Sequence, residues 1–208
     1  MSKADSLLSA VRKVATASGL PWPHVQRFYA ALQESSPESP ITWLPKSTGR
    51  NIALATPDRI ANLLIALAAA RSPDEAKAAV MWAAQLAESG RKNLAELGRS
   101  PFADAISRLV ADADAASQVE RIELNPVDGC ATITCADNSH RFSLPPEDRA
   151  DHVWAPWVVP FPTEKRLIET VGIIDGHLIR ELSTAISWSF EKVAFRKSPQ
   201  DVSEDADG

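Results

Sequence analysis

The chain has 208 residues, of which 45% are hydrophobic and 24% are charged, and its formal net charge is −5. This is the composition of an ordinary globular protein, and the length allows one large domain or two small ones. The negative net charge argues against a protein that coats nucleic acid over its whole surface, although it permits a local basic face.

Charge is unevenly distributed along the chain. Residues 1–60 carry seven basic and four acidic side chains, a net of +3, which leaves −8 for the remainder. Such asymmetry fits a basic N-terminal module fused to an acidic body. The two cysteines, Cys130 and Cys135, imply no disulfide framework, and no secretory signal is evident at the N-terminus. The longest apolar stretch, residues 60–70, is too short to span a bilayer, so we expect a cytoplasmic protein with no membrane contact.

Two helices and a hairpin are predicted in the first third of the chain. Apolar side chains recur at helical spacing over residues 5–18 and 23–35, and Gly19 separates the two helices. The stretch that follows is rich in proline, which excludes a helix. Two short extended pieces, Ile41 to Leu44 and Asn51 to Leu54, predict a small β-hairpin there.

Three further helices are predicted at residues 57–70, 73–89 and 101–116. Each is preceded by a serine or threonine and begins with a proline. The hydroxyl is expected to cap the helix, and the proline suits the first turn, where its missing N–H costs nothing.

After residue 117 the hydrophobic period changes from 3.6 to 2. The segments VERIEL, CATITC and HRFSL alternate and predict a three-stranded meander. A loop rich in proline and tryptophan then leads to a fourth strand at about residues 165–173 and to a last helix that ends near Arg196. The acidic tail, residues 198–208, is predicted to be disordered.

The corner between the first two helices has the residue types of a helix-turn-helix. A small residue in the first helix, a glycine in the turn and an apolar residue in the second helix are required, and Ala15, Gly19 and Val25 supply them. Val14, Leu20 and Phe28 stand where further core contacts are expected, so Leu20 is predicted to be buried with the other two.

The segment from about Val14 to Ala70 resembles the MerR-type winged helix-turn-helix. The elements match the family in this order: Arg27-Phe28-Tyr29 in the second helix, Leu44-Pro45 and Arg50 in the wing, and Thr56-Pro57-Asp58 at the start of the returning helix. The resemblance implies a DNA-binding module with a recognition helix and a basic wing. The arrangement is also similar to that of prophage-type regulators.

These patterns together predict an α+β protein. Residues 1–70 form the winged helix-turn-helix, residues 71–117 a helical connector, and residues 118–197 a small antiparallel sheet packed by a C-terminal helix. The function predicted is that of a sequence-specific transcriptional regulator that binds double-stranded DNA. A single small module has modest, salt-dependent affinity, so a homodimer is expected.

The predicted DNA contacts come from two places. His24, Gln26 and Arg27 on the recognition helix would face the major groove, because arginine and glutamine have the donor geometry to read base edges. The wing would bring Lys46, Ser47, Thr48 and Arg50 to phosphates, through charge and hydroxyl donors.

Two other functions fit the same sequence. One is a phage packaging or assembly subunit, similar to a small terminase with an N-terminal helix-turn-helix. The other is a winged-helix inhibitor that binds protein, for which Trp154, Trp157 and Phe161 in the proline-rich loop offer aromatic anchors. The interpretation favoured for these residues is a loop packed down over the sheet by its own tryptophans.

No enzyme, metal site or cofactor is predicted. The histidines His24, His140, His152 and His177 are scattered and lie in no recognised catalytic motif. Cys130 and Cys135 with the two middle histidines could be imagined as zinc ligands, but their five-residue separation differs from the usual pairing of ligands two to four residues apart. We therefore expect structural cysteines.

Overall fold

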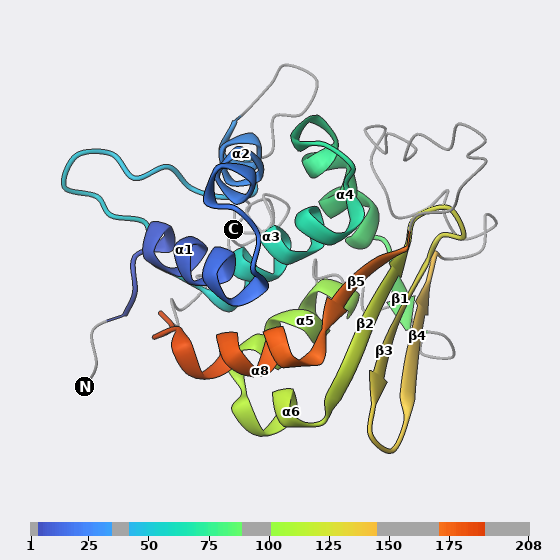
Figure 1. Ribbon diagram of the computed structural model, residues 1–208. Helices are drawn as coiled ribbons and strands as arrows, with labels where there is room; N and C mark the ends of the chain where they lie inside the picture. The colour runs from blue at the N-terminus through green and yellow to red at the C-terminus, as the bar shows by residue number, and fades with distance from the viewer. Residues whose placement is uncertain (1–3, 35–41, 89–100, 145–170, 190–208) are drawn as a thin grey trace, which may run out of the picture.

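The computed structural model describes residues 4–34, 42–88, 101–144 and 171–189. The protein is mixed α+β and is arranged around α3 (Pro57–Ala69), which runs through the middle of the other elements (Figure 1). Seven residues of α3 are buried, and they are distributed over most of its circumference. A helix that is apolar on nearly every side is stable only when other elements surround it.

Elements from the whole described chain surround α3. It contacts α2 (Trp22–Gln33), α4 (Ala76–Ala83), α5 (Pro101–Ala111) and two strands, β2 (Val119–Asn125) and β5 (Gly172–Asp175). The buried side chains form one cluster that draws on every described segment. The N-terminal helices therefore share their core with the sheet, and the predicted division of the chain at residues 70 and 117 passes through this cluster.

The sheet has five antiparallel strands in the order β1-β4-β3-β2-β5. The predicted meander is confirmed, because β2, β3 (Cys130–Cys135) and β4 (Ser139–Ser143) pair in sequence. Their alternation turns Ile122, Ile133 and Phe142 toward the core. α5 and α8 (Gly176–Ala185) lie against this inner face, where the rings of Phe102 and Phe142 are 5.2 Å apart (Figure 1).

The sheet has one strand more than predicted. The helix expected over residues 73–89 begins as a short 3₁₀ turn, η1 (Pro73–Glu75), continues as α4 and ends at Ala83. Ala87–Glu88 then forms β1, which pairs with the outer edge of β4. Helical periodicity alone could not predict that the helix ends early and becomes a strand, because the extended backbone of β1 is stabilised by pairing with β4, which is distant in the sequence.

Two other helices also differ from the prediction. The helix expected at residues 101–116 is divided, because the Asp112 carboxylate accepts hydrogen bonds from the N–H groups of Asp114 and Ala115 and starts α6 (Ala113–Ser117). The last helix ends at Ala185, since Ile186 is extended (φ −97°, ψ 128°). Residues 190–196 of that predicted helix lie outside the described residues.

The predicted hydroxyl caps are wrong at two helix starts. Neither Thr56 before α3 nor Ser72 before η1 makes a side-chain cap hydrogen bond. Thr56 is only 6% exposed, and its hydroxyl has no hydrogen-bond partner in the described structure. Proline at the next position removes one N–H from the first turn, so fewer donors remain for a cap.

Several predicted features fall outside the described residues. They are Trp154, Trp157 and Phe161 in the proline-rich loop, His152, the start of the predicted fourth strand, and the acidic tail. The described end of that strand is β5, which pairs with β2. Within the ranges that are described, no helix has the length and apolarity needed to cross a membrane.

Candidate nucleic-acid interface

The corner between α1 (Leu7–Ser18) and α2 is closed by a left-handed glycine. Gly19 has φ 69° and ψ 6°, and its N–H donates to the Thr16 carbonyl at 3.3 Å. Ala15 and Val25 are buried on either side of the turn, as predicted from their spacing. Leu20 is a correction, because it is 36% exposed and lies at the rim of a cavity rather than in the core.

α2 exposes the three residues that were expected to read DNA. Its buried stripe consists of Val25, Phe28, Tyr29 and Leu32, and His24, Gln26 and Arg27 are exposed. Successive residues of a helix are about 100° apart, so His24 and Gln26 lie on opposite flanks with Arg27 between them. The outward side therefore presents one central cation, and the His24 ring packs 5.0 Å from the ring of Phe28.

The rest of this outward side is small or acidic. Helical spacing places Pro23, Ala30 and Glu34 in line with Arg27, and all three are exposed. On α2, Arg27 is therefore the main hydrogen-bond donor available to read bases, and Glu34 places a negative charge at the C-terminal end of the helix.

The segment after α2 is tied to the end of that helix. The N–H groups of Trp43 and Leu44 both donate to the Leu32 carbonyl, and the Gln33 side-chain amide donates to the Tyr29 hydroxyl and to the Pro45 carbonyl at 2.8 Å. Burial raises the pKa of Tyr29 above its usual value, although the Gln33 hydrogen bond opposes the effect. A ladder was expected between residues 41–44 and 51–54, and it is wrong for the described residues 42–44, because the Trp43 and Leu44 N–H groups are bonded to the Leu32 carbonyl of α2.

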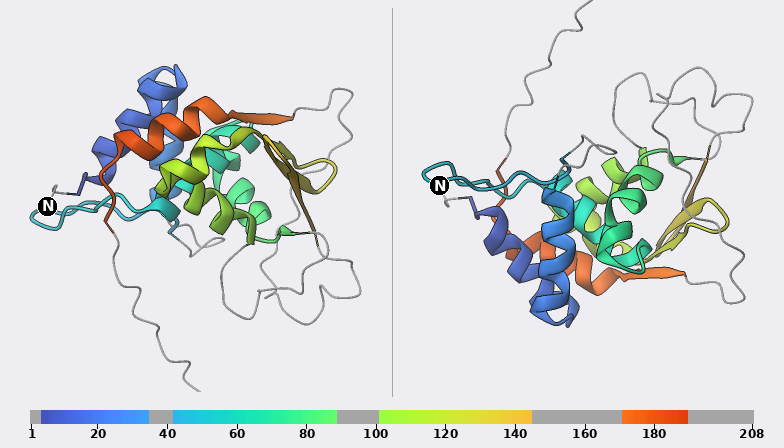
Figure 2. Two further views of the ribbon diagram at one scale, coloured as in Figure 1. Left: turned by 90° about the horizontal axis from the view of Figure 1, so that it is seen from below. Right: turned by 90° about the horizontal axis from the view of Figure 1, so that it is seen from above.

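A loop projects from the molecule between Pro45 and Ala53, on the side away from the sheet (Figure 1; Figure 2, both views). Two backbone hydrogen bonds between Thr48 and Asn51, of 3.0 and 2.9 Å, hold its tip, where Gly49 has φ 54°. The Ser47 hydroxyl accepts from the Ala53 N–H at 3.1 Å. Lys46, Ser47, Thr48 and Arg50 are all exposed on this projecting loop.

The returning limb of the projecting loop is anchored to both ends of the described chain. The Leu7 N–H donates to the Ala53 carbonyl at 2.7 Å, and the Ala55 N–H donates to the Asp5 carbonyl at 2.9 Å. The Ala55 carbonyl accepts from the Ser189 N–H at 2.8 Å. The base of the loop is therefore fixed, while its tip stands free of other described elements.

Asp5 holds this anchor together. Its carboxylate accepts from Lys13 Nζ at 2.7 Å and from the Ser187 N–H at 2.9 Å, and Lys13 Nζ also donates to the Ala185 carbonyl. Burial alone would raise the pKa of Asp5, but these hydrogen bonds and the Lys13 charge outweigh it, so the pKa lies below its usual value. The carboxylate remains charged at neutral pH and ties α1 to the segment after α8.

Unpaired cations gather on the N-terminal helices and the projecting loop. Arg27, Lys46 and Arg50 make no ion pair with any described residue, and Arg12 only packs over the Trp22 ring at 5.4 Å. Elsewhere most described cations are engaged: Arg71 with Glu75, Arg108 with Asp104, Arg121 with Glu123, Arg59 with the Leu54 carbonyl, and Arg180 with the Val119 carbonyl. Charges left without partners are free to meet an external anion.

Arg12 was not predicted as a site residue. It lies on the exposed side of α1, and its contact with Trp22 brings it close to the start of α2. The packing of α1 against α2 reveals the closeness of Arg12 to α2, which the sequence does not predict. The sequence does show that Arg12 and Arg27 belong to the same basic N-terminal region.

Of the imagined zinc residues, the three that are described, Cys130, Cys135 and His140, form no metal-binding group. Cys130 and Cys135 are free thiols at the two ends of β3, and His140 Nδ1 lies 2.8 Å from a Glu88 carboxylate oxygen. Among the described residues there is no group of three or more His, Cys, Asp or Glu side chains that could hold a metal ion.

Comparison with known proteins adds no relative to this description. No family model, no curated protein and no solved structure matches the chain. The function must therefore be argued from the residues themselves.

Proposed function

We propose that this protein binds double-stranded DNA through α2 and the projecting loop, and that it acts as a transcriptional regulator. The observation that carries the proposal is the set of four exposed cations, Arg12, Arg27, Lys46 and Arg50, that have no carboxylate partner in the described structure. In such an arrangement α2 serves as the recognition helix and the projecting loop as the wing.

The physical argument separates affinity from specificity. Cations on the projecting loop and at Arg12 suit phosphates, which give affinity without sequence preference. Arg27, at the centre of the outward side of α2, suits a guanine edge in the major groove, with Gln26 on one flank. Because so few bases can be read by one copy, useful specificity needs two copies on a two-fold site, and we propose a homodimer as the DNA-binding form.

Salt dependence provides the test. In the proposed homodimer, Arg12, Lys46 and Arg50 of the two copies would neutralise six phosphates, so log K falls against log salt with a slope of about −5.4 and binding weakens about 1,800-fold between 50 and 200 mM salt. Fluorescence anisotropy with genomic DNA fragments measures this slope. An Arg27→Ala, Arg50→Ala double variant should reduce the slope by about 1.8, because Arg50 of each copy loses its phosphate contact, and it should also relax the sequence preference that Arg27 provides.

A matched control removes the same charge elsewhere. Arg108 and Arg141 are exposed cations of α5 and β4, outside the proposed surface, so an Arg108→Ala, Arg141→Ala variant should keep the wild-type slope. Equal slopes for wild type and the Arg27, Arg50 variant would refute the proposed surface.

One observation favours a second candidate function, protein binding by the same loop. Ile52 is 58% exposed beside Arg50, and a large apolar side chain at a loop tip suits a protein partner better than a phosphate. Wild-type protein that shows no salt-dependent DNA binding would favour this candidate.

A further inference from the structure

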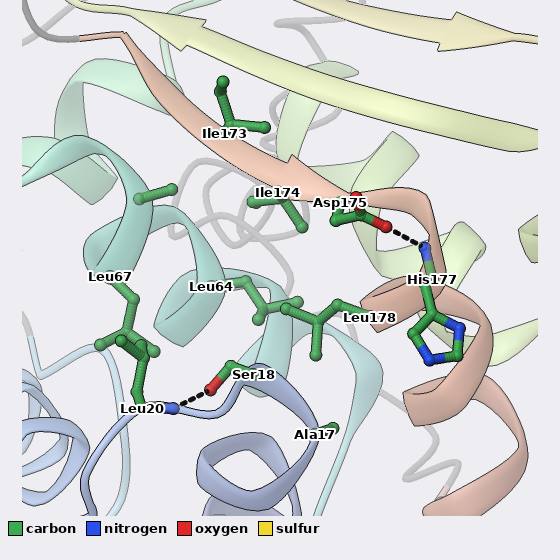
Figure 3. Close-up of a pocket in the computed structure, with 11 residues that line it drawn as sticks. Ala17, Ser18, Leu20, Leu64, Leu67, Ile173, Ile174, Asp175, His177 and Leu178 are labelled. Atoms are coloured by element: carbon green, nitrogen blue, oxygen red, sulfur yellow. Dashed lines mark hydrogen bonds between the residues drawn. The ribbon is translucent and has the colours of Figure 1, made fainter.

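A cavity of about 340 Å³ lies beside the corner that holds α2 (Figure 3). The end of α1, the second half of α3, β5 and the start of α8 all contribute to its wall. Leu64 and Ile174 line it and are themselves buried, and Leu67 and Leu178 are half-buried beside them. The volume is at the lower end of the range for small-molecule sites, and an apolar lining with a few polar groups is typical of them.

The polar side chains that line the cavity are Ser18, Asp175 and His177, and the His177 ring can donate as well as accept. Asp175 caps α8, with one carboxylate oxygen accepting from the His177 N–H at 2.7 Å, and its other oxygen, Oδ2, bonds to no described residue. Ser18 donates its hydroxyl to the Ala15 carbonyl and accepts from the Leu20 N–H, so its proton is already used.

Among the lining residues, Asp175 carries the carboxylate and His177 carries the basic group, and no lysine or arginine of the described chain lines the cavity. A second carboxylate lies nearby, because Glu181 Oε2 is 4.0 Å from His177 Nε2. Arg121 stands opposite Asp175 on β2, but its guanidinium is 3.2 Å from the Glu123 carboxylate. An anionic ligand would be repelled by the Asp175 and Glu181 carboxylates, whereas a cation would be complementary to them.

We propose that this cavity is a binding site for a small amphipathic amine. The apolar body of the ligand packs against Leu64, Leu67 and Leu178, and its ammonium group donates to Asp175 Oδ2. A charge-assisted hydrogen bond of this kind gives orientation, and the apolar contacts give most of the affinity.

The position of the site has a consequence for α2. Ser18 and Leu20 flank Gly19, so a ligand in the cavity contacts the turn from which α2 starts. A change in DNA affinity on ligand binding rests on the proposed function, whereas the binding of the amine does not.

The test compares two probes of the same shape and opposite charge. 2-Phenylethylammonium and 3-phenylpropanoate are titrated separately into the ¹⁵N-labelled full chain, and amide shifts are followed by NMR. We expect saturable shifts at Leu20 and Leu178 with the amine, with a dissociation constant on the order of 1 mM, and binding of the carboxylate at least about tenfold weaker. Equal affinities for the two probes, or no saturable shift at these residues, would overturn the proposal.

Variants locate the bound amine. Asp175→Asn removes the charge but keeps an N-cap acceptor, so the protein should fold and bind the amine about tenfold more weakly. Asp112→Asn makes the same change at the cap of α6, away from the cavity, and should bind as wild type does. Leu20→Ser removes an exposed part of the wall and should weaken amine binding as well. Binding that survives both Asp175→Asn and Leu20→Ser unchanged would show that the cavity is not the site.

A last arm separates the two proposals. If the amine binds and DNA affinity stays the same, the coupling to α2 is wrong and the site stands. If the protein without amine fails to bind DNA, the proposed function is wrong, and the amine titration still decides the cavity.

Discussion

The close approach of α3 to β5 gives the sharpest test of the fold around the candidate site. A Cβ atom added at Gly172 would lie 2.0 Å from the backbone oxygen of Ala68, and side-chain carbons almost never come within 3.0 Å of such an atom. Gly172→Ala therefore requires a displacement of about 1 Å between the central helix and the sheet edge. Overpacking in a closely packed interior costs about 1–3 kcal/mol, and the neighbour here is backbone that cannot rotate aside. Alanine also restricts the unfolded chain, which stabilises the folded state by about 0.4–1 kcal/mol. We therefore expect the free energy of unfolding to fall by about 2 kcal/mol.

Gly19→Ala is the matched comparison, since it makes the same chemical change for a different reason. No atom lies within 4 Å of a Cβ added at Gly19, but its φ of 69° is left-handed. An alanine in this left-handed conformation is strained by about 1–2 kcal/mol, and its restriction of the unfolded chain again offsets part of that cost. The free energy of unfolding should therefore fall by about 1 kcal/mol or less. Urea unfolding followed by far-ultraviolet circular dichroism measures both, and the m-values should match wild type. If Gly172→Ala is no more destabilising than Gly19→Ala, the approach of α3 to β5 is not as close as described.

Two further predictions concern single ionisable groups. Asp5→Asn removes the charged acceptor for Lys13 and the Ser187 N–H, and should cost about 1.5–3 kcal/mol in urea at pH 7. Because the folded pKa of Asp5 lies below the ordinary 3.8, its stabilisation is present above that value and is lost as pH falls through the folded pKa, so the difference between wild type and variant should shrink in acid. A difference that grows on acidification would contradict the anchor. Burial raises the pKa of Cys135, so iodoacetamide at pH 8 should label it more slowly than Cys130, as followed by peptide mass spectrometry. Faster labelling of Cys135 would show that it is not protected in this way.

Local patterns in the sequence identify most of the secondary structure. The apolar repeat over residues 7–18, with Gly19 at its end, predicts α1 and its left-handed stop, because a helix must bury one face and only glycine takes that turn freely. Alternation of apolar and polar residues, with one irregularity between Val119 and Ile122, predicts β2, β3 and β4 and their order, since adjacent strands with short turns pair as a meander. The sequence also predicts the exposure of Arg27, which lies on the polar side of a helix, and of Lys46 and Arg50, which lie in a polar loop.

The errors occur where a distant segment competes with a local preference. Ala87–Glu88 lies in a helical pattern, yet it becomes β1 because the edge of β4 satisfies its backbone. Leu20 was expected in the core but is exposed, because a cavity separates it from Leu67 and Ile173. Those two residues belong to distant segments, so the sequence around Leu20 could not show that this space stays open.

The chain's own residues thus determine the helix faces, the meander, the basic N-terminal region and the glycine at the corner, all of which depend on neighbours a few positions away. Only the tertiary structure decides that α3 is the centre of one shared core, that β1 extends the sheet, and that residues of α1, α3, β5 and α8 line one cavity. The physical reason is the distance along the chain over which each kind of interaction acts. Periodicity and capping act within one or two turns, whereas packing joins segments more than 100 residues apart, whose relative positions depend on how the whole core is filled.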